Sequence, residues 1–164
     1  MLHSRIAWID FYNSAQPTPI NKQTYTSGFS TSSQSVYISN SLFKSITSSS
    51  QGGALCCSTS VEYLLIESTS FFSCKTSSGN GGAIYFSNEN NGQCVLHEIC
   101  GYDCCTTSGD KGQFTWIFAN NAASSKNYFE YSSIARCVSE SSSSWYTILL
   151  YYAIMTVSTI SHMC

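Results

Sequence analysis

The stretch SSSQGGALCCSTS at residues 48–60 returns as SSGNGGAIYFSNE at residues 77–89. Self-similarity at a period of about 20–50 residues is typical of solenoids and propellers. Both copies place Gly-Gly-Ala and an aliphatic residue after a polar run. The paired glycines predict a corner that needs positive φ or leaves no room for a Cβ atom. The predicted corner glycines are Gly52, Gly53, Gly81, Gly82 and Gly112.

The repeat extends to four rows when the second glycine of each pair sets the register. The aligned column is Gly53, Gly82, Gly112 and Trp145. Two apolar columns follow: Leu55, Ile84, Phe114 and Thr147, then Cys57, Phe86, Trp116 and Leu149. A second strand-like run contributes the columns Tyr37, Ile66, Leu96, Phe129 and Leu42, Phe71, Gly101, Ile134. The alternate spacing predicts strands with one buried face.

The length of the repeat narrows the architecture. A unit of about 30 residues with short strands cannot bury its apolar face alone, so it must stack on copies of itself. Propeller blades need about 40 residues or more, and the Leu-x-x-Leu-x-Leu pattern of leucine-rich repeats is missing. We therefore predict an all-β parallel β-helix of about four coils of 29–33 residues across residues 36–150. Residues 1–35 are expected to form a degenerate coil or N-terminal cap, with IAWIDFY (6–12) as a strand.

Composition excludes several classes of function. Charged residues make up 10% of the 164 residues and the net charge is -2, so no basic face is available for nucleic acid. No dinucleotide-binding or phosphate-binding loop is present, so no cofactor is expected. Residues 1–19 lack the basic start and apolar run of a signal peptide, and the chain has no Asn-x-Ser/Thr acceptor for glycosylation.

The nine cysteines leave two kinds of chemistry open. The register stacks Ser45, Cys74, Cys104 and Cys137 in one column. Neighbouring coils lie about 4.8 Å apart, within the Cα separation that a disulfide accepts. Buried thiols are the favoured interpretation, because small buried cysteines are common and no export signal indicates oxidation. A metal site is the weaker alternative. Its candidate ligands lack the paired Cys-x2-Cys of structural zinc sites, and they are Cys94, His97, Cys100, Cys104 and Cys105.

One column stacks titratable residues, and its members are Ile38, Glu67, His97 and Glu130. On stacked coils Glu67 and Glu130 would lie about 10 Å apart, near the upper end for the paired acids of an inverting glycosidase. A polysaccharide-cleaving enzyme that uses Glu67, His97 and Glu130 is therefore an alternative. The favoured interpretation is an ordinary outward polar column, in which a His between two Glu is a favourable charge arrangement.

QGGALCC and NGGAIYF, each about ten residues after LFKS or FFSC, resemble the Gly-Gly-Ala-Ile and Phe-x-x-Asn repeats of polymorphic outer membrane proteins. The resemblance covers residues 36–90, with Ile46 and Lys75 in place of the Asn. It implies a right-handed, pectin-lyase-like β-helix that serves surface display or adhesion rather than catalysis. A cell-surface or extracellular location and contact with carbohydrate or protein follow from the same resemblance. A fragment of a larger repeat protein is the remaining alternative.

The C-terminal stretch has no Asp, Glu, Lys or Arg from residue 141 to residue 164. Its most apolar part begins at Trp145 and ends at Ile160, which is shorter than the roughly 20 residues of a membrane-spanning helix. Buried strands are the simpler interpretation, and a membrane segment is the alternative. Residues 151–164 are expected to be an unfinished coil or apolar tail, whose open end could pair edge to edge with another chain.

Overall fold

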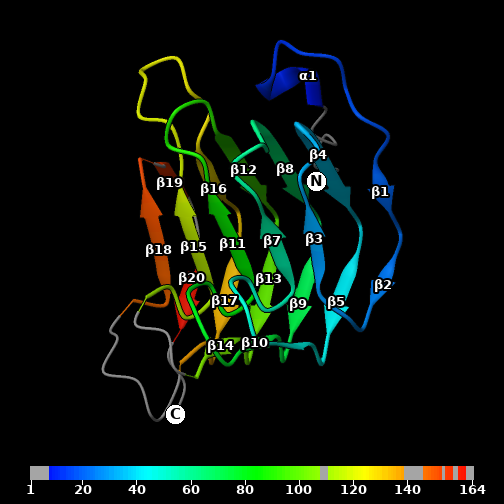
Figure 1. The fold of residues 1–164 in the computed structure, drawn as a ribbon, viewed down its shortest axis with the longest axis vertical. Coiled ribbons are helices and arrows are strands. Elements are labelled where there is room, and N and C mark those ends of the chain that lie inside the picture. The colour runs from blue at the N-terminus through cyan, green and yellow to red at the C-terminus, as the bar shows by residue number, and fades with distance from the viewer. Residues whose placement is uncertain (1–7, 108–110, 139–145, 153, 157–158, 162–164) are drawn as a thin grey trace.

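The computed structural model describes residues 8–107, 111–138, 146–152, 154–156 and 159–161. The chain winds into a solenoid of about four turns, in which parallel strands from successive turns stack side by side (Figure 1). The predicted all-β parallel solenoid is therefore confirmed. Each turn contributes strands to the same sheets, so residues one coil apart in the sequence become neighbours in space.

Four sheets make up the stack. Sheet A contains β1 (Ile20–Asn21), β4 (Ser35–Ser39), β8 (Tyr63–Glu67), β12 (Gln93–His97), β16 (Tyr128–Glu130) and β19 (Ile154–Thr156). Sheet B contains β2 (Thr24–Tyr25), β5 (Leu42–Lys44), β9 (Ser70–Phe72), β13 (Cys100–Tyr102), β17 (Ser133–Ala135) and β20 (Thr159–Ser161). Sheet C contains β3 (Phe29–Thr31), β7 (Leu55–Cys57), β11 (Ile84–Ser87), β15 (Thr115–Phe118) and β18 (Ile148–Tyr151). The short sheet D contains β6 (Thr47–Ser48), β10 (Lys75–Thr76) and β14 (Cys105–Thr106).

Aromatic rings stack through the centre of the solenoid. The ring of Phe43 lies 4.6 Å from that of Tyr25 and 4.9 Å from that of Phe71, with interplanar angles of 10° and 7°. The next coil has Gly101 in this column, and a Cβ atom there would lie 2.5 Å from the ring of Phe114. Phe114, the residue before β15, therefore occupies the space that Gly101 leaves open.

The predicted register is wrong by one residue in two places. Phe71 pairs with Phe43 rather than Leu42, so the coil between them is one residue shorter than the alignment predicts. Ile84 pairs with Thr115 rather than Phe114, so that coil is one residue longer than the alignment predicts. A slip of one residue turns every side chain to the opposite face, so the packing of the Phe43 ring decides the register. The Ser-rich corners contain no signal that would have shown these changes in coil length.

The corner glycines have two separate roles. Gly52, Gly81 and Gly112 adopt φ values of 65°, 70° and 67°. Gly53 and Gly82 instead leave no room: an added Cβ would lie 2.0 Å from the Gly82 carbonyl oxygen and 2.1 Å from that of Gln113, respectively. Gly112 therefore belongs with Gly52 and Gly81, not with Gly53 and Gly82 as the sequence alignment predicts. Trp145, the fourth member of that predicted column, lies outside the described residues.

Residues other than glycine form two further corners in each coil. Columns of residues with φ between 45° and 55° follow sheet A and sheet B, and their members are Asn40, Ser68, Glu98, Tyr131 and Ser45, Ser73, Asp103, Arg136. The backbone N–H groups of the first three members of each column donate to the next coil, as from Ser73 to the Tyr102 carbonyl at 2.9 Å. Inter-coil hydrogen bonds hold these residues in the left-handed backbone conformation, which glycine adopts more easily than other residues.

Residues 8–11 form a short helix, α1 (Trp8–Phe11), so the strand predicted there is wrong. The helical turn places Trp8 and Tyr12 on one face, because residues four apart align along a helix. Both rings pack against the outer face of sheet A, where the covered residues are Tyr37, Leu65 and Val95. The Tyr12 hydroxyl also donates to the Leu64 carbonyl at 2.6 Å. A strand would also place Trp8 and Tyr12 on one face, but it would set the acidic Asp10 between them on that face.

Candidate functional site

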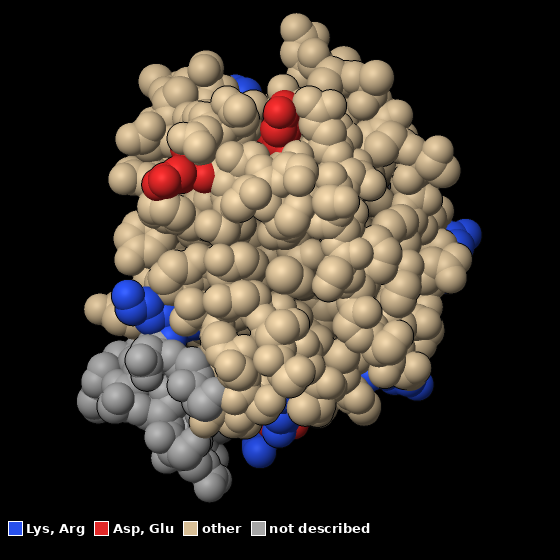
Figure 2. Space-filling model, in the orientation of Figure 1, with Lys and Arg blue, Asp and Glu red and all other residues tan. Residues whose placement is uncertain are grey.

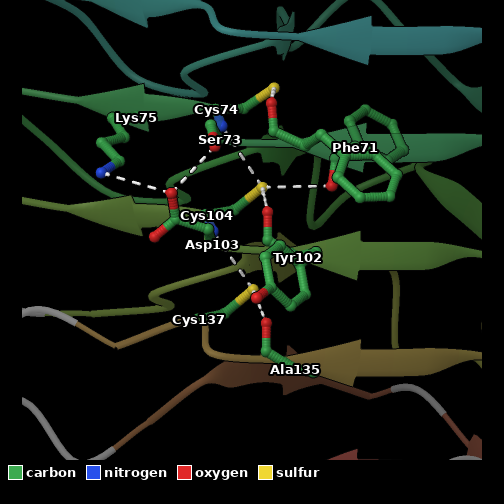
Figure 3. Close-up of polar contacts among 10 residues, drawn as sticks. Phe71, Ser73, Cys74, Lys75, Tyr102, Asp103, Cys104, Ala135 and Cys137 are labelled. Atoms are coloured by element: carbon green, nitrogen blue, oxygen red, sulfur yellow. Dashed lines mark hydrogen bonds and ion pairs between the residues drawn. The ribbon is translucent and has the colours of Figure 1, made fainter. Parts of the chain in front are cut away.

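A column of thiols follows sheet B on the inside of the solenoid (Figure 3). The backbone N–H of Cys74 donates to the sulfur of Cys104 at 3.4 Å, and that of Cys104 donates to the sulfur of Cys137 at 3.4 Å. Each thiol donates in turn to a carbonyl two residues earlier, at 3.3 to 3.4 Å. The sulfurs thus satisfy polar backbone groups at a buried corner, which would otherwise cost about 1–3 kcal/mol each.

The Lys75 amide donates to the Ile46 carbonyl, just as the Cys105 amide donates to the Cys74 carbonyl one coil later. Ile46 therefore holds the place in the first coil that Cys74 holds in the second, and the prediction of Ser45 at this place is wrong. The Asn position of the Phe-x-x-Asn motif is accordingly taken by Ile46 after Phe43, and by Cys74 after Phe71. The assignment of Lys75 to that position is wrong, because it assumed Phe72 as the motif aromatic. Cysteine supplies the side-chain acceptor at this corner, and burial raises the pKa of Cys104.

Outside the same corner, charged groups lie on the surface. The Asp103 carboxylate accepts a hydrogen bond from the Ser73 hydroxyl at 2.8 Å and lies 3.6 Å from the Lys75 ammonium (Figure 3). Exposed ion pairs of this kind contribute about 0–1 kcal/mol. Across the described residues, no three His, Cys, Asp or Glu side chains are grouped so that they could hold a metal ion. The candidate set around Cys94, His97 and Cys100 is thus not brought together.

The titratable column begins with Ser39 rather than Ile38, and continues through Glu67, His97 and Glu130. These side chains point outward as predicted, but Glu67 is only 3% exposed and His97 only 8% exposed. The Tyr37 hydroxyl donates to the Glu67 carboxylate at 2.5 Å. His97 Nδ1 lies 3.5 Å from the Glu130 carboxylate, and its Nε2 lies 4.0 Å from that of Glu98. Neighbouring side chains therefore cover Glu67 and His97, although both lie on the outer face of sheet A.

A cavity that the sequence did not predict lies where the chain passes from sheet C to sheet A. Its volume is about 370 Å³, and it is lined by Thr59, Ser60, Glu62, Ser87, Asn88, Glu89, Asn90, Asn91 and Phe118. The loops of two successive coils, at residues 58–62 and 88–92, form most of it. The run NENNG at residues 88–92 is the signal that could have indicated it, since polar loop residues carry binding sites.

The outer face of sheet C, which adjoins this cavity, carries mainly uncharged side chains on its strands. Figure 2 shows the side of the molecule on which sheet C lies; most of it is tan, with acidic side chains in its upper part and basic side chains toward its edges. Outward positions of β11, β15 and β18 carry Tyr85, Trp116 and Leu149 in one register. The next outward register carries Ser87, Phe118 and Tyr151. Sheet C therefore presents an aromatic outer face that ends at the cavity.

Comparison with known families gives one finding. The model of the Chlamydia polymorphic membrane protein repeat matches residues 40–58, which span β5, β6 and β7. The resemblance to polymorphic membrane protein repeats is thus supported on the strands of one coil and its Gly-Gly corner. Neither the search of curated proteins nor the search of solved structures finds a match.

The apolar C-terminal stretch contains strands where the structure describes it, namely β18, β19 and β20. The side chains of Tyr151, Tyr152 and Ile154 are exposed, so the interpretation of this stretch as fully buried strands is wrong for these residues. Within the described part of the chain, every helix falls short of the length and apolar character that crossing a membrane requires.

Proposed function

We propose that this chain is a non-catalytic recognition scaffold of the surface or adhesin-like kind, whose outer faces contact carbohydrate or protein. The observation that carries the proposal is the repeat match at residues 40–58, on strands of a parallel solenoid. A solenoid presents long regular faces, and repeat proteins use such faces for binding. The outer face of sheet C is rich in aromatic side chains, with the Lys111 ammonium 5.6 Å from the centre of the Trp116 ring, and aromatic residues are enriched at contact surfaces.

The burial of the acidic column supports the same proposal against the enzyme alternative. A glycosidase needs two carboxyl groups that reach the substrate from opposite sides. Glu67 is covered and accepts a hydrogen bond from Tyr37, while His97 and Glu130 contact each other. The column thus contributes to cohesion between neighbouring coils, and a polysaccharide chain has no direct access to Glu67.

The test combines binding with a search for cleavage. The purified chain is incubated with immobilised glycans and surface proteins, and with soluble polysaccharides whose reducing ends are counted. We expect retention on at least one surface and no new reducing ends. Cleavage that disappears in the variant Glu67→Gln would replace this proposal with the enzyme alternative. A folded chain that binds no surface in either panel would also contradict the proposal.

A further inference from the structure

The cavity between the loops at residues 58–62 and 88–92 has the construction of a preformed site. Asn88 is buried and holds the loops together: its side-chain amide donates to the Val61 carbonyl at 3.1 Å and its oxygen accepts from the Asn91 amide at 3.1 Å. The Asn88 backbone N–H donates to the Phe118 carbonyl at 2.9 Å. The Asn120 side chain donates to the Asn90 carbonyl from the following coil. A site held in this way loses little entropy on binding.

The lining combines hydrogen-bonding groups with one aromatic wall. The lining residues that carry hydroxyl or amide groups are Thr59, Ser60, Ser87, Asn90 and Asn91. Phe118 forms the wall, and its ring lies 5.0 Å from the exposed ring of Tyr151 and 6.1 Å from that of Tyr152. Hydroxyl and amide groups match the hydroxyl groups of a sugar, while an aromatic face packs against its C–H surface.

Charge and size limit the ligand further. Glu62 and Glu89 line the cavity, and none of the described lining residues is Lys or Arg, so carboxylated or sulfated sugars would be repelled. The Glu62 carboxylate accepts a hydrogen bond from Gln34 at 2.9 Å, which fixes its position. The volume of about 370 Å³ corresponds to roughly a dozen waters at about 30 Å³ each. That space suits a sugar ring rather than a folded partner.

We propose that this cavity binds a sugar unit of a neutral oligosaccharide, with Phe118 as the stacking surface and the loop hydroxyl and amide groups as hydrogen-bonding partners. The proposal rests on the recognition function proposed above and names its ligand class and site. The exposed rings of Tyr151 and Tyr152 extend the aromatic wall, so a following sugar unit can continue along the edge of sheet C.

The experiment uses the full chain and defined probes. Neutral glucose, mannose and N-acetylglucosamine oligomers, and acidic galacturonate and heparin oligomers, are titrated to about 10 mM while backbone amide shifts are recorded by NMR. At least one neutral oligomer is expected to shift amides of residues 58–62 and 87–91, with the acidic oligomers at least about tenfold weaker. Phe118→Ala should weaken binding at least about tenfold.

Two further variants separate binding from folding. Phe72→Ala removes a 40% exposed ring from sheet B and should leave the affinity unchanged. Glu89→Lys reverses one charge at an exposed position of the cavity and should strengthen the binding of acidic oligomers. If Phe118→Ala fails to fold, the Glu89→Lys titration alone tests the site. An unchanged ratio between the affinities for neutral and acidic oligomers would then overturn the sugar site.

The remaining outcomes distinguish this inference from the proposed function. Amide shifts confined to other residues, or no shift with any neutral oligomer, overturn the sugar site. If the chain still adheres to immobilised protein in that case, the recognition scaffold stands without the sugar site. If a bound oligomer is instead cleaved, the sugar site stands and the non-catalytic scaffold is wrong.

Discussion

Single residues decide how closely neighbouring coils approach. Gly53 and Gly82 lie where the backbone of one coil contacts that of the next, and Gln113 stands in the third coil at the corresponding place. The Gln113 side chain reaches back, and its oxygen accepts a hydrogen bond from the Thr106 amide at 3.2 Å.

The substitution Gly82→Ala is expected to destabilise the protein by roughly 3 kcal/mol, the upper end of the cost of overpacking a core. The added Cβ would lie 2.1 Å from the Gln113 oxygen and 2.4 Å from a Cys105 backbone atom. Gly28→Ala is the matched control, because its Cβ would lie 3.5 Å from its nearest neighbour, and a change within about 0.5 kcal/mol is expected. Urea unfolding of both variants provides the measurement, and equal losses would contradict the close-approach account.

At the scale of elements, helix α1 is the part that strand periodicity could not indicate. The alternation in IAWIDFY suits a strand, yet the outer face of sheet A is apolar at Leu65 and Val95 and needs a cover. The Trp8 and Tyr12 rings, 4.7 Å apart, supply that cover from one helical turn. Tertiary demand from a distant sheet therefore overrides the local pattern.

Replacing Trp8 with alanine should detach this cover and reduce stability by about 3–5 kcal/mol, the usual range for a buried Trp. Amide protons of β8 and β12 should then exchange with solvent faster, because the sheet face beneath the helix becomes accessible. Ile9→Ala serves as the control, since Ile9 is 68% exposed and adjacent in sequence. Unfolding titrations and hydrogen exchange check both variants, and equal behaviour would show that α1 does not stabilise sheet A.

The whole molecule carries buried thiols through most of its coils. Burial raises the pKa of Cys57, Cys94 and Cys104 well above the ordinary thiol value of 9.0. In the unfolded chain these thiols lose their protons near pH 9, while in the folded chain they keep them. The folded state then binds more protons than the unfolded state, so stability falls as pH rises.

The free energy of unfolding under reducing conditions should therefore stay constant up to about pH 8 and decline above about pH 9, where each such thiol contributes a loss of up to about 1.4 kcal/mol per pH unit. Tyr12 adds to the decline above about pH 10, since burial raises its pKa as well. Denaturant titrations at several pH values measure the profile. The variant Cys94→Ala should show a shallower slope, and a profile without any decline would mean that the thiols ionise in the folded chain.

The sequence alone determined the architecture, because a short regular repeat with alternating apolar positions has few stable solutions other than a stack of parallel strands. It also identified the glycine corners and the cysteine column. Only the tertiary structure decided the register at Phe43 and Thr115, since ring packing selects between pairings that differ by one residue. Coverage by neighbouring residues likewise decided that Glu67 is buried, and loop stacking between coils created the cavity at Phe118. Both features depend on contacts between coils, which no single row of the repeat contains.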